Sequence, residues 1–303
     1  MGKTFAIIAV ASWENRFIYG LEKNIHTYCP DEVIMFFYSE YAILTEANRK
    51  KMRDICKERK IKLIEKELFF SESIRSWKTI REVLLVEKYK NNILVDFSTM
   101  PRETIYSVFY FLDSVSAKTH YIYYRPEQYN KEWLSRDPGK PRLVLKLSGI
   151  TIVGQKTILV ILTGFDSERT RQLIRYFDPS LTLIVTQEGK QYDNEAANII
   201  KHKKLIAELS PEIEIEEFSI DAYSQDNGYS LLENKIESIL NKGNIVLSSL
   251  GPKPSAVSLY KVHRRYPQIA LAYAPSNEFN PAYSTGIMEK NPVIGILKSE
   301  ELK

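Results

Sequence analysis

Two stretches of the sequence combine small hydroxyl side chains, proline and a basic residue within a short span. The first is DFSTMPRE at positions 96–103, and the second is SSLGPKPSA at positions 248–256. A loop of this kind that opens a helix offers backbone N–H groups, the positive end of the helix dipole and a cation, so it predicts an anion site. The other interpretation is an ordinary helix start whose basic residue is solvated. The candidate ligand-binding residues in these loops are Ser98, Thr99, Arg102, Ser249, Lys253 and Ser255.

Two further loops place an arginine next to an acid, ASWENR at 11–16 and TGFDSER at 163–169. A guanidinium binds phosphate in a bidentate manner, and a neighbouring carboxylate can hold that guanidinium or accept a hydrogen bond from a ribose hydroxyl. The alternative is a local ion pair that caps the helix. The candidates for ligand binding here are Glu14, Arg16, Asp166 and Arg169.

Aromatic and amide side chains complete the set of candidates. Trp13 and Phe165 lie in the two arginine loops and could stack on a base. The alternative is that each ring packs into the hydrophobic core, as an aromatic residue next to a strand end often does. Asn130 and Asn280 close the related stretches YIYYRPEQYN and ALAYAPSNEFN. They could read the edge of a base, or they could be ordinary turn residues.

Catalysis has fewer candidates in this sequence. Asp96 follows an apolar run, where a carboxylate in an α/β enzyme often points into the site, and Glu103 lies seven positions later; both are candidates for acid/base catalysis or for holding Mg²⁺. The position equivalent to Asp96 is Ser248, so any chemistry would be confined to one half of the chain. No HExxH, Walker A, G-x-S-x-G or glycine-rich dinucleotide motif is present. No metal site and no cofactor is evident, and Mg²⁺ is expected only if the chain is an enzyme.

These loops need a scaffold, and the sequence predicts an alternation of strands and helices. Short apolar runs over 4–11, 32–40, 61–69, 91–98 and 118–126 alternate with helical patterns over 17–25, 45–60, 73–86 and 99–114. From 157 the same order begins again and ends at 275. Such an alternation is typical of parallel βαβ units, in which ligands bind outside the carboxyl ends of the strands.

The two series indicate an internal duplication. Pro126 and Pro275 are 149 positions apart (275 − 126), and Arg16 and Arg169 are 153 apart (169 − 16). We therefore expect two tandem Rossmann-like domains, 1–150 and 151–303, with a join over 131–155 that contains an extra strand, RLVLKL. The alternative is one large sheet whose strands resemble each other.

Composition limits the partners. A net charge of +4 and a pI near 8.7 suit an anionic small ligand and do not by themselves predict a protein that coats nucleic acid. The two cysteines have no metal-type spacing, and no apolar run reaches the roughly 18 residues of a membrane span. We expect a cytoplasmic protein.

A short loop after strand one and the hydroxyl-rich loop STMPRE after strand four, in two Rossmann-like halves, resemble the CARF domains of CRISPR-associated proteins. Two such domains in one chain look like the SAVED sensors of prokaryotic antiphage systems. The typical Gly-Gly-Thr run of the fourth loop is absent here. The resemblance implies that two facing half-sites clasp a cyclic oligonucleotide, which CARF domains sometimes cleave, and that the sensor controls an effector. No effector segment is left over in this chain, so a separate protein partner is expected.

Three functional hypotheses follow. The first is a sensor-type binding protein that takes a nucleotide-like phosphorylated ligand in a cleft between the halves, lined by Arg16, Arg102, Arg169 and Lys253. The second is a nucleotide or nucleic-acid hydrolase, of phosphodiesterase or ring-nuclease type, that uses Asp96. The third is a scaffold subunit whose 19 tyrosines mediate protein contacts, which homo-oligomerisation would also use.

Overall fold

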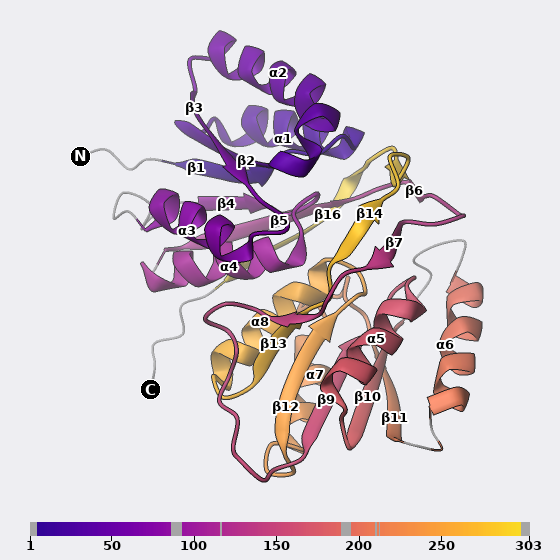
Figure 1. Ribbon diagram of the computed structural model, residues 1–303. Coiled ribbons are helices and arrows are strands. Elements are labelled where there is room, and N and C mark those ends of the chain that lie inside the picture. The colour runs from indigo at the N-terminus through magenta and orange to yellow at the C-terminus, as the bar shows by residue number, and fades with distance from the viewer. Residues whose placement is uncertain are drawn as a thin grey trace. The chain divides into compact units, whose positions relative to one another are not determined.

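The computed structural model describes residues 5–85, 93–115, 117–188, 195–209, 211 and 213–297, with the side chains of 195–198 left out (Figure 1). The chain forms two compact units. Unit 1 comprises Met1–Tyr129 and Pro281–Lys303, and unit 2 comprises Asn130–Asn280. Each unit is an α/β domain built on one six-stranded sheet.

Unit 1 has the sheet order β16-β5-β4-β1-β2-β3, in which the first five strands of the unit are parallel and β16 is antiparallel to β5. Helices α1 and α2 cover one face, and α3 and α4 cover the other (Figure 1). The strands are β1 (Ala6–Val10), β2 (Glu32–Tyr38), β3 (Lys62–Leu68), β4 (Ile93–Asp96), β5 (Thr119–Arg125) and β16 (Met288–Leu297). The helices are α1 (Asn15–Tyr28), the 3-10 turn η1 (Ser39–Tyr41), α2 (Ala42–Glu58), α3 (Ser73–Leu84) and α4 (Arg102–Ser114).

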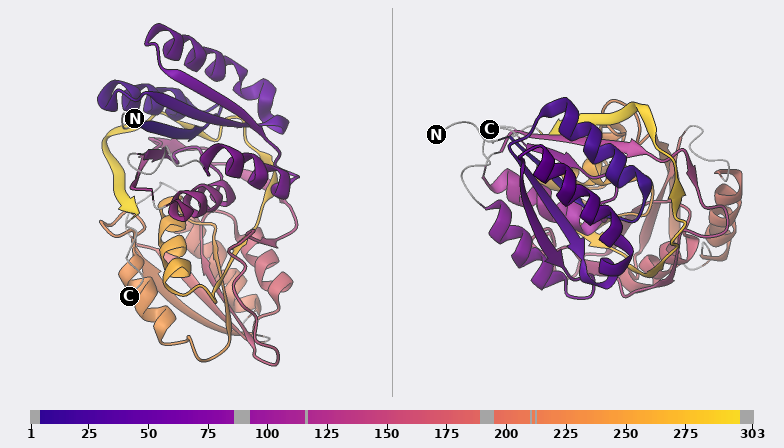
Figure 2. Two further views of the ribbon diagram at one scale, coloured as in Figure 1. Left: turned by 90° about the vertical axis from the view of Figure 1, so that its left-hand side faces the viewer. Right: turned by 90° about the horizontal axis from the view of Figure 1, so that it is seen from above.

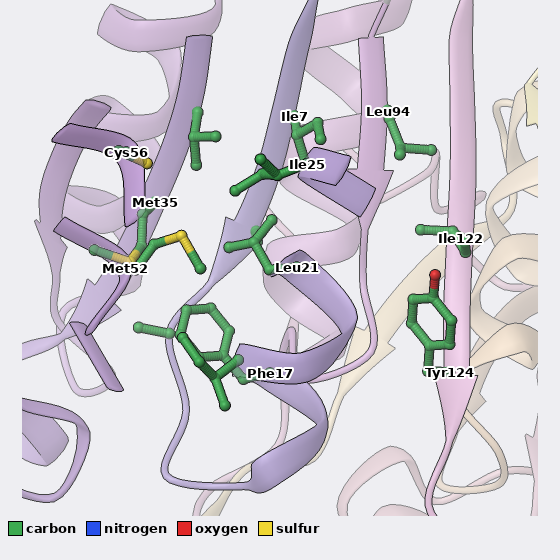
Figure 3. Packing of buried hydrophobic residues seen from close by; sticks show 14 residues of the cluster. Ile7, Phe17, Leu21, Ile25, Met35, Met52, Cys56, Leu94, Ile122 and Tyr124 are labelled. Atoms are coloured by element: carbon green, nitrogen blue, oxygen red, sulfur yellow. The ribbon is translucent and has the colours of Figure 1, made fainter. Parts of the chain in front are cut away.

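The packing of α1 shows how the sequence pattern builds this unit. Phe17, Leu21 and Ile25 recur at helical spacing and are buried against Ile7 of β1 and Met35 of β2 (Figure 3). Each such side chain contributes roughly 1.5–3 kcal/mol on burial. The helix ends where the next residue, of left-handed conformation, donates its N–H to the Ile25 carbonyl.

Unit 2 repeats the arrangement with the sheet order β11-β10-β9-β12-β13-β8, in which β8 is antiparallel to β13 and the other strands are parallel. Leu159 and Ile161 of β9 pack with Leu173 and Ile174 of α5 in its core. The strands are β8 (Arg142–Leu143), β9 (Thr157–Leu162), β10 (Leu181–Gln187), β11 (Glu214–Ile220), β12 (Asn244–Ser249) and β13 (Ala270–Tyr273). The helices are α5 (Ser167–Phe177), α6 (Glu195–Leu209), α7 (Tyr229–Glu237) and α8 (Pro254–Arg265).

The sixth strand of each sheet comes from the other repeat. The segment after β5 leaves unit 1 and supplies β8 to unit 2, whereas the segment after β13 leaves unit 2 and supplies β16, drawn in yellow, to unit 1 (Figure 2). Two short two-stranded sheets also pair a strand of one repeat with a strand of the other. In unit 1, β6 (Gln128–Tyr129) pairs with β15 (Ser284–Thr285), and in unit 2, β14 (Ser276–Phe279) pairs with β7 (Ser135–Pro138). The two repeats therefore exchange their tails.

The prediction of two Rossmann-like parallel sheets is confirmed, and the alternative of one large sheet is wrong. The compact units divide the chain at 130 and 281, because each exchanged tail packs with the opposite repeat. The predicted boundary between residues 150 and 151 separates the two sequence repeats and not the two compact units. It stays a prediction about the internal duplication.

Local differences from the sequence prediction have simple causes. Helix α2 begins at Ala42 after the turn η1, three residues before the helical pattern over 45–60, and the Thr45 hydroxyl donates to the carbonyl of Tyr41, the residue before the helix. The extra strand in the join exists but spans only Arg142–Leu143. Strand β16 was not predicted, because its first half is polar and contains Pro292. Among the described residues, no helix has the length and hydropathy of a membrane span.

Candidate functional site

The loops that carry the predicted site meet at the switch point of each sheet. In unit 1 the chain runs from β1 outward to β2 and β3 and then returns to β4 on the other side of β1. A crevice at the carboxyl ends of such strands is where open α/β sheets bind ligands. Ala9 pairs with Asp96 in the register of β1 and β4, and the Thr99 hydroxyl donates to the Val10 carbonyl at 2.7 Å. The first and fourth loops of unit 1 therefore lie side by side, as the sequence predicts.

Asp96 is buried at the end of β4, where its carboxylate shapes the fourth loop. One oxygen accepts from the backbone N–H of Ser98 at 3.0 Å and from its hydroxyl at 2.5 Å. The other oxygen accepts from the Asn24 amide at 2.8 Å. Ser98 in turn accepts from the backbone N–H of Tyr124, whose phenol donates to Asn24. Burial and the nearby Asp96 carboxylate both raise the pKa of Tyr124. These contacts make Asp96 the centre of a buried network that links α1, β4 and β5.

Arg16 has an ion-pair partner inside unit 1. Its side chain is 1 % exposed, and it binds both carboxylate oxygens of Glu14, with Nε–Oε2 at 2.9 Å and Nη2–Oε1 at 3.1 Å. Nη1 also donates to the carbonyl of Tyr124 at 3.4 Å, at the end of β5. Burial alone would lower the pKa of Arg16, but Glu14 and the nearby tyrosines Tyr123 and Tyr129 raise it well above its usual value. This geometry is the local ion pair that the sequence left open as an alternative.

Arg169 repeats this arrangement in unit 2. Asp166 is the N-cap of α5, where it accepts from the backbone N–H of Arg169 at 3.0 Å and from its Nε at 2.8 Å. Nη1 donates to the carbonyl of Ala274, just beyond β13, and Nη2 donates to the Ser135 hydroxyl at 3.1 Å. Each arginine therefore ties the first loop of its unit to the end of the fifth strand.

The first turn of α4 holds the half-buried candidates of unit 1. Arg102 is the first residue of the helix and Glu103 the second. One turn later, Tyr106 is 1 % exposed, and its hydroxyl has no hydrogen-bond partner in the described part of the chain. Burial raises the pKa of Tyr106, and Arg102 partly offsets this effect. Burying a hydroxyl without a hydrogen-bond partner lowers the stability of the folded state, so the Tyr106 hydroxyl is a group that a bound ligand or a water molecule could satisfy.

The equivalent loop of unit 2 is closed by its own backbone. Leu250 and Gly251 donate their N–H groups to the Leu162 carbonyl, and a Cβ on Gly164 would lie 2.1 Å from the Leu250 carbonyl oxygen. The hydroxyls of Ser249 and Ser255 lie 2.6 Å apart. The half-buried Lys253 caps α8, which begins at Pro254. A helix therefore does start at this loop, as both interpretations of the sequence require, and Ser249 and Ser255 are buried.

Asn130 makes a local turn contact, whereas Asn280 bonds to a segment distant in the sequence. The Asn130 side chain accepts from the backbone N–H of Glu132 at 2.9 Å. Asn280 is buried, and its amide donates to the Trp133 carbonyl at 2.9 Å. Among the described residues, no group of three His, Cys, Asp or Glu side chains could hold a metal ion. The roles of the predicted residues in ligand binding or catalysis remain predictions.

The sequence interpretation missed the aromatic residues that follow β2 and β3. Tyr38 ends β2, Tyr41 ends η1, and Phe70 follows β3, so all three lie at the carboxyl edge that holds the candidate loops. The signal was present in FFYSEY at 36–41 and ELFFS at 67–71, because these runs end the second and third strands. The predicted ligand-binding residues came only from the loops after the first, fourth and fifth strands.

Neither protein-family models nor curated proteins match this chain. Among solved structures, the chain is similar to a type III CRISPR defence DNA nuclease activated by cyclic oligoadenylate, with a TM-score of 0.55 and 7 % identity. The alignment covers 85 % of this chain but 63 % of the nuclease, which is less than two thirds of its length. Alignments to the cytoplasmic domain of a prokaryotic cation chloride cotransporter and to a periplasmic sugar-binding protein from Pseudomonas fluorescens have TM-scores of 0.25 and 0.24, too low to carry an argument. The similarity to the nuclease shows the shared fold alone.

Proposed function

We propose that this chain is a sensor-type protein that binds a nucleotide-like phosphorylated ligand at the carboxyl-edge loops of its Rossmann-like units. The observation that carries the proposal is the meeting of the first and fourth loops at the switch point of unit 1, directly before α4. The N-terminus of α4 provides backbone N–H groups and the positive end of the helix dipole, and Arg102 adds a cation there.

The similarity to the CRISPR nuclease supports a finer version of this proposal. That nuclease is described as activated by cyclic oligoadenylate. We propose that the present chain has a CARF-like architecture, that a cyclic oligonucleotide is the first ligand class to test, and that the protein acts in prokaryotic defence through a separate effector protein. A cytoplasmic location stays an expectation.

A thermal-shift screen tests the proposal directly. The purified protein is heated with AMP, ATP, a linear dinucleotide and cyclic oligonucleotides, and each mixture is then examined by mass spectrometry. A ligand that binds only the folded state raises the midpoint by mass action. We expect at least one nucleotide to raise it and to be recovered intact. Recovery of a cleaved nucleotide would instead favour the hydrolase hypothesis.

Paired variants locate the site. Arg102→Ala combined with Lys253→Ala removes the two cations at the starts of α4 and α8, and we expect it to abolish the shift. Lys50→Ala combined with Lys57→Ala removes the same charge from the exposed side of α2 and is the matched control. Equal binding by both double variants would contradict the proposal.

A further inference from the structure

Four aromatic rings at or after the ends of β1, β2 and β3 gather at the carboxyl edge of unit 1. Trp13 follows β1, Tyr38 ends β2, Tyr41 ends η1, and Phe70 follows β3. The ring centroids of Trp13 and Tyr41 are 5.4 Å apart, those of Tyr41 and Phe70 are 6.3 Å apart, and those of Tyr38 and Phe70 are 5.6 Å apart. The rings form one continuous row, which we call the aromatic row.

The aromatic row is only partly buried, and exposed apolar side chains lie in the first turns of the two helices that follow β2 and β3. Trp13, Tyr41 and Phe70 are half-buried, whereas Tyr38 is buried. Ile43, in the first turn of α2, is 93 % exposed, and Ile74, in the first turn of α3, is 59 % exposed. Both of these helices start at the same edge of the sheet. Exposed apolar side chains and half-buried aromatic rings at one edge of a sheet are consistent with a binding surface.

Hydrogen bonds hold the aromatic row in place. The Glu40 carboxylate accepts from the backbone N–H groups of Phe70 at 2.9 Å and Ser71 at 3.0 Å, which fixes the loop that carries Phe70. Burial would raise the pKa of Glu40, but these hydrogen bonds lower it below its usual value. The loop is thus fixed before any ligand arrives, which reduces the entropy lost on binding.

The aromatic row is joined directly to the proposed anion site. The Tyr38 hydroxyl and the Thr104 hydroxyl lie 2.5 Å apart, and Thr104 belongs to the first turn of α4, two residues after Arg102. The indole N–H of Trp13 is buried and has no acceptor in the described part of the chain. Indole N–H groups usually find a partner when buried. The hydrogen bond between Tyr38 and Thr104 therefore connects the aromatic row to the first turn of α4, and the indole N–H of Trp13 is a donor that a ligand could use.

The strand ends of unit 2 differ from those of unit 1 in the described residues. Phe165 occupies the place of Trp13, whereas β10, the counterpart of β2, ends at Gln187 and not at a tyrosine. The inference therefore concerns unit 1.

We propose that Trp13, Tyr41 and Phe70 form a stacking subsite for the base of the nucleotide, beside the anion site at the start of α4. This inference rests on the proposed function and adds that unit 1 selects a planar aromatic group. Flat bases stack on aromatic side chains whatever their sequence, and phosphates bind at helix starts. A purine nucleotide supplies both groups on one small molecule.

The test compares probes with and without a base. Binding of ATP, a cyclic oligoadenylate and inorganic tripolyphosphate is measured by calorimetry on the full chain. The variant Tyr41→Leu with Phe70→Leu removes two rings but keeps apolar volume, and Tyr176→Leu, which removes an exposed ring from α5, is the control in unit 2. We expect the double variant to weaken nucleotide binding about 5-fold to 100-fold and to leave tripolyphosphate binding unchanged. The control variant should bind every probe as the unaltered protein does.

A fluorescence titration gives a second measurement on the folded protein. Trp77→Phe with Trp133→Phe leaves Trp13 as the single indole of the chain. We expect a nucleotide, but not tripolyphosphate, to quench its emission.

The outcomes separate the two proposals. If no probe binds, the proposed function fails and the subsite fails with it. If tripolyphosphate binds as tightly as the nucleotides and the double variant has no effect, the anion site stands and the stacking subsite is wrong. If the double variant alters self-association in sedimentation experiments but leaves nucleotide affinity unchanged, the aromatic row is a protein contact and the inference is overturned.

Discussion

Ser135 and Ser284 hold equivalent places in the two units, although each belongs to the tail of the opposite repeat. The two residues are 149 positions apart (284 − 135), the same spacing as the two strand-five prolines. Ser284 donates its hydroxyl to Glu14, which holds Arg16, while Arg169 donates to the hydroxyl of Ser135. In the short two-stranded sheets, Ser284 pairs with Tyr129 and Ser135 pairs with Phe279. The exchange of tails therefore extends to individual side chains.

The exchange predicts which fragments fold. Fragment 130–280 contains every strand of the unit 2 sheet, whereas fragment 151–303 lacks β8 and carries the unpartnered β16. We expect 130–280 to unfold cooperatively in urea, and we expect 1–150 and 151–303 to be unstable or to aggregate through exposed edges. Circular dichroism and sedimentation measure both properties. Cooperative unfolding of 151–303 alone would contradict the importance of the exchanged strands.

The hydroxyl of Ser284 should stabilise unit 1. Ser284→Ala removes a donor from the Glu14 carboxylate, which lies in a buried ion pair, and hydrogen bonds to charged groups contribute about 1.5–3 kcal/mol. We expect a loss of that size in the free energy of unfolding measured in urea. Ser114→Ala is the control, because Ser114 is on the exposed end of α4 and bonds only to its own helix at the Tyr110 carbonyl. Its effect should stay within about 0.5 kcal/mol. Equal losses would show that Ser284 has no special role.

Asp96→Asn separates a structural carboxylate from a catalytic one. The amide that replaces the carboxylate cannot accept from both Ser98 and Asn24, so we expect a loss of about 1–3 kcal/mol in stability. If the nucleotide screen finds turnover, we expect it to persist in the folded fraction of this variant. Abolished turnover in a variant that retains its fold and its nucleotide affinity would support Asp96 as a catalytic residue.

Asp226 should make stability depend on pH in the acid range. Burial would raise the pKa of Asp226, but hydrogen bonds from Ser230, Ser224 and Gly228 lower it to about 2. Because the folded pKa lies below that of the unfolded chain, the stabilisation is present above about pH 4 and is lost as the pH falls toward 2.

The corresponding experiment compares Asp226→Asn with the unaltered protein across this range. We expect the variant to be less stable at pH 6 and the difference to shrink as the pH falls from 4 to 2. Asp54→Asn, on the exposed side of α2, is the control. A stability difference that does not change with pH would show that the carboxylate charge is unimportant for the start of α7.

Much of the fold could be predicted because its causes are local. The apolar runs and helical patterns from Ala6 to Tyr273 identify, in order, the ten parallel strands and eight helices of the described residues. The switch point followed from the same pattern, since parallel strands joined by helices bring the loops after the first and fourth strands together. That the loops hold Arg16 and Arg169 at helix starts was also visible in the sequence.

Tertiary structure decided what those residues touch. The sequence could not tell whether Arg16 contacts Glu14, because an ion pair and a ligand site need the same residues at the same spacing; in the folded chain the buried guanidinium contacts Glu14 and the carbonyl of Tyr124. It also could not assign the tails. Because the two repeats end in similar segments, either segment could pair with the edge strand of either sheet. Which segment pairs with which edge depends on contacts between distant parts of the chain, and no local pattern encodes these contacts. The exchange of β8 and β16 and the gathering of the aromatic row are therefore properties of the folded chain.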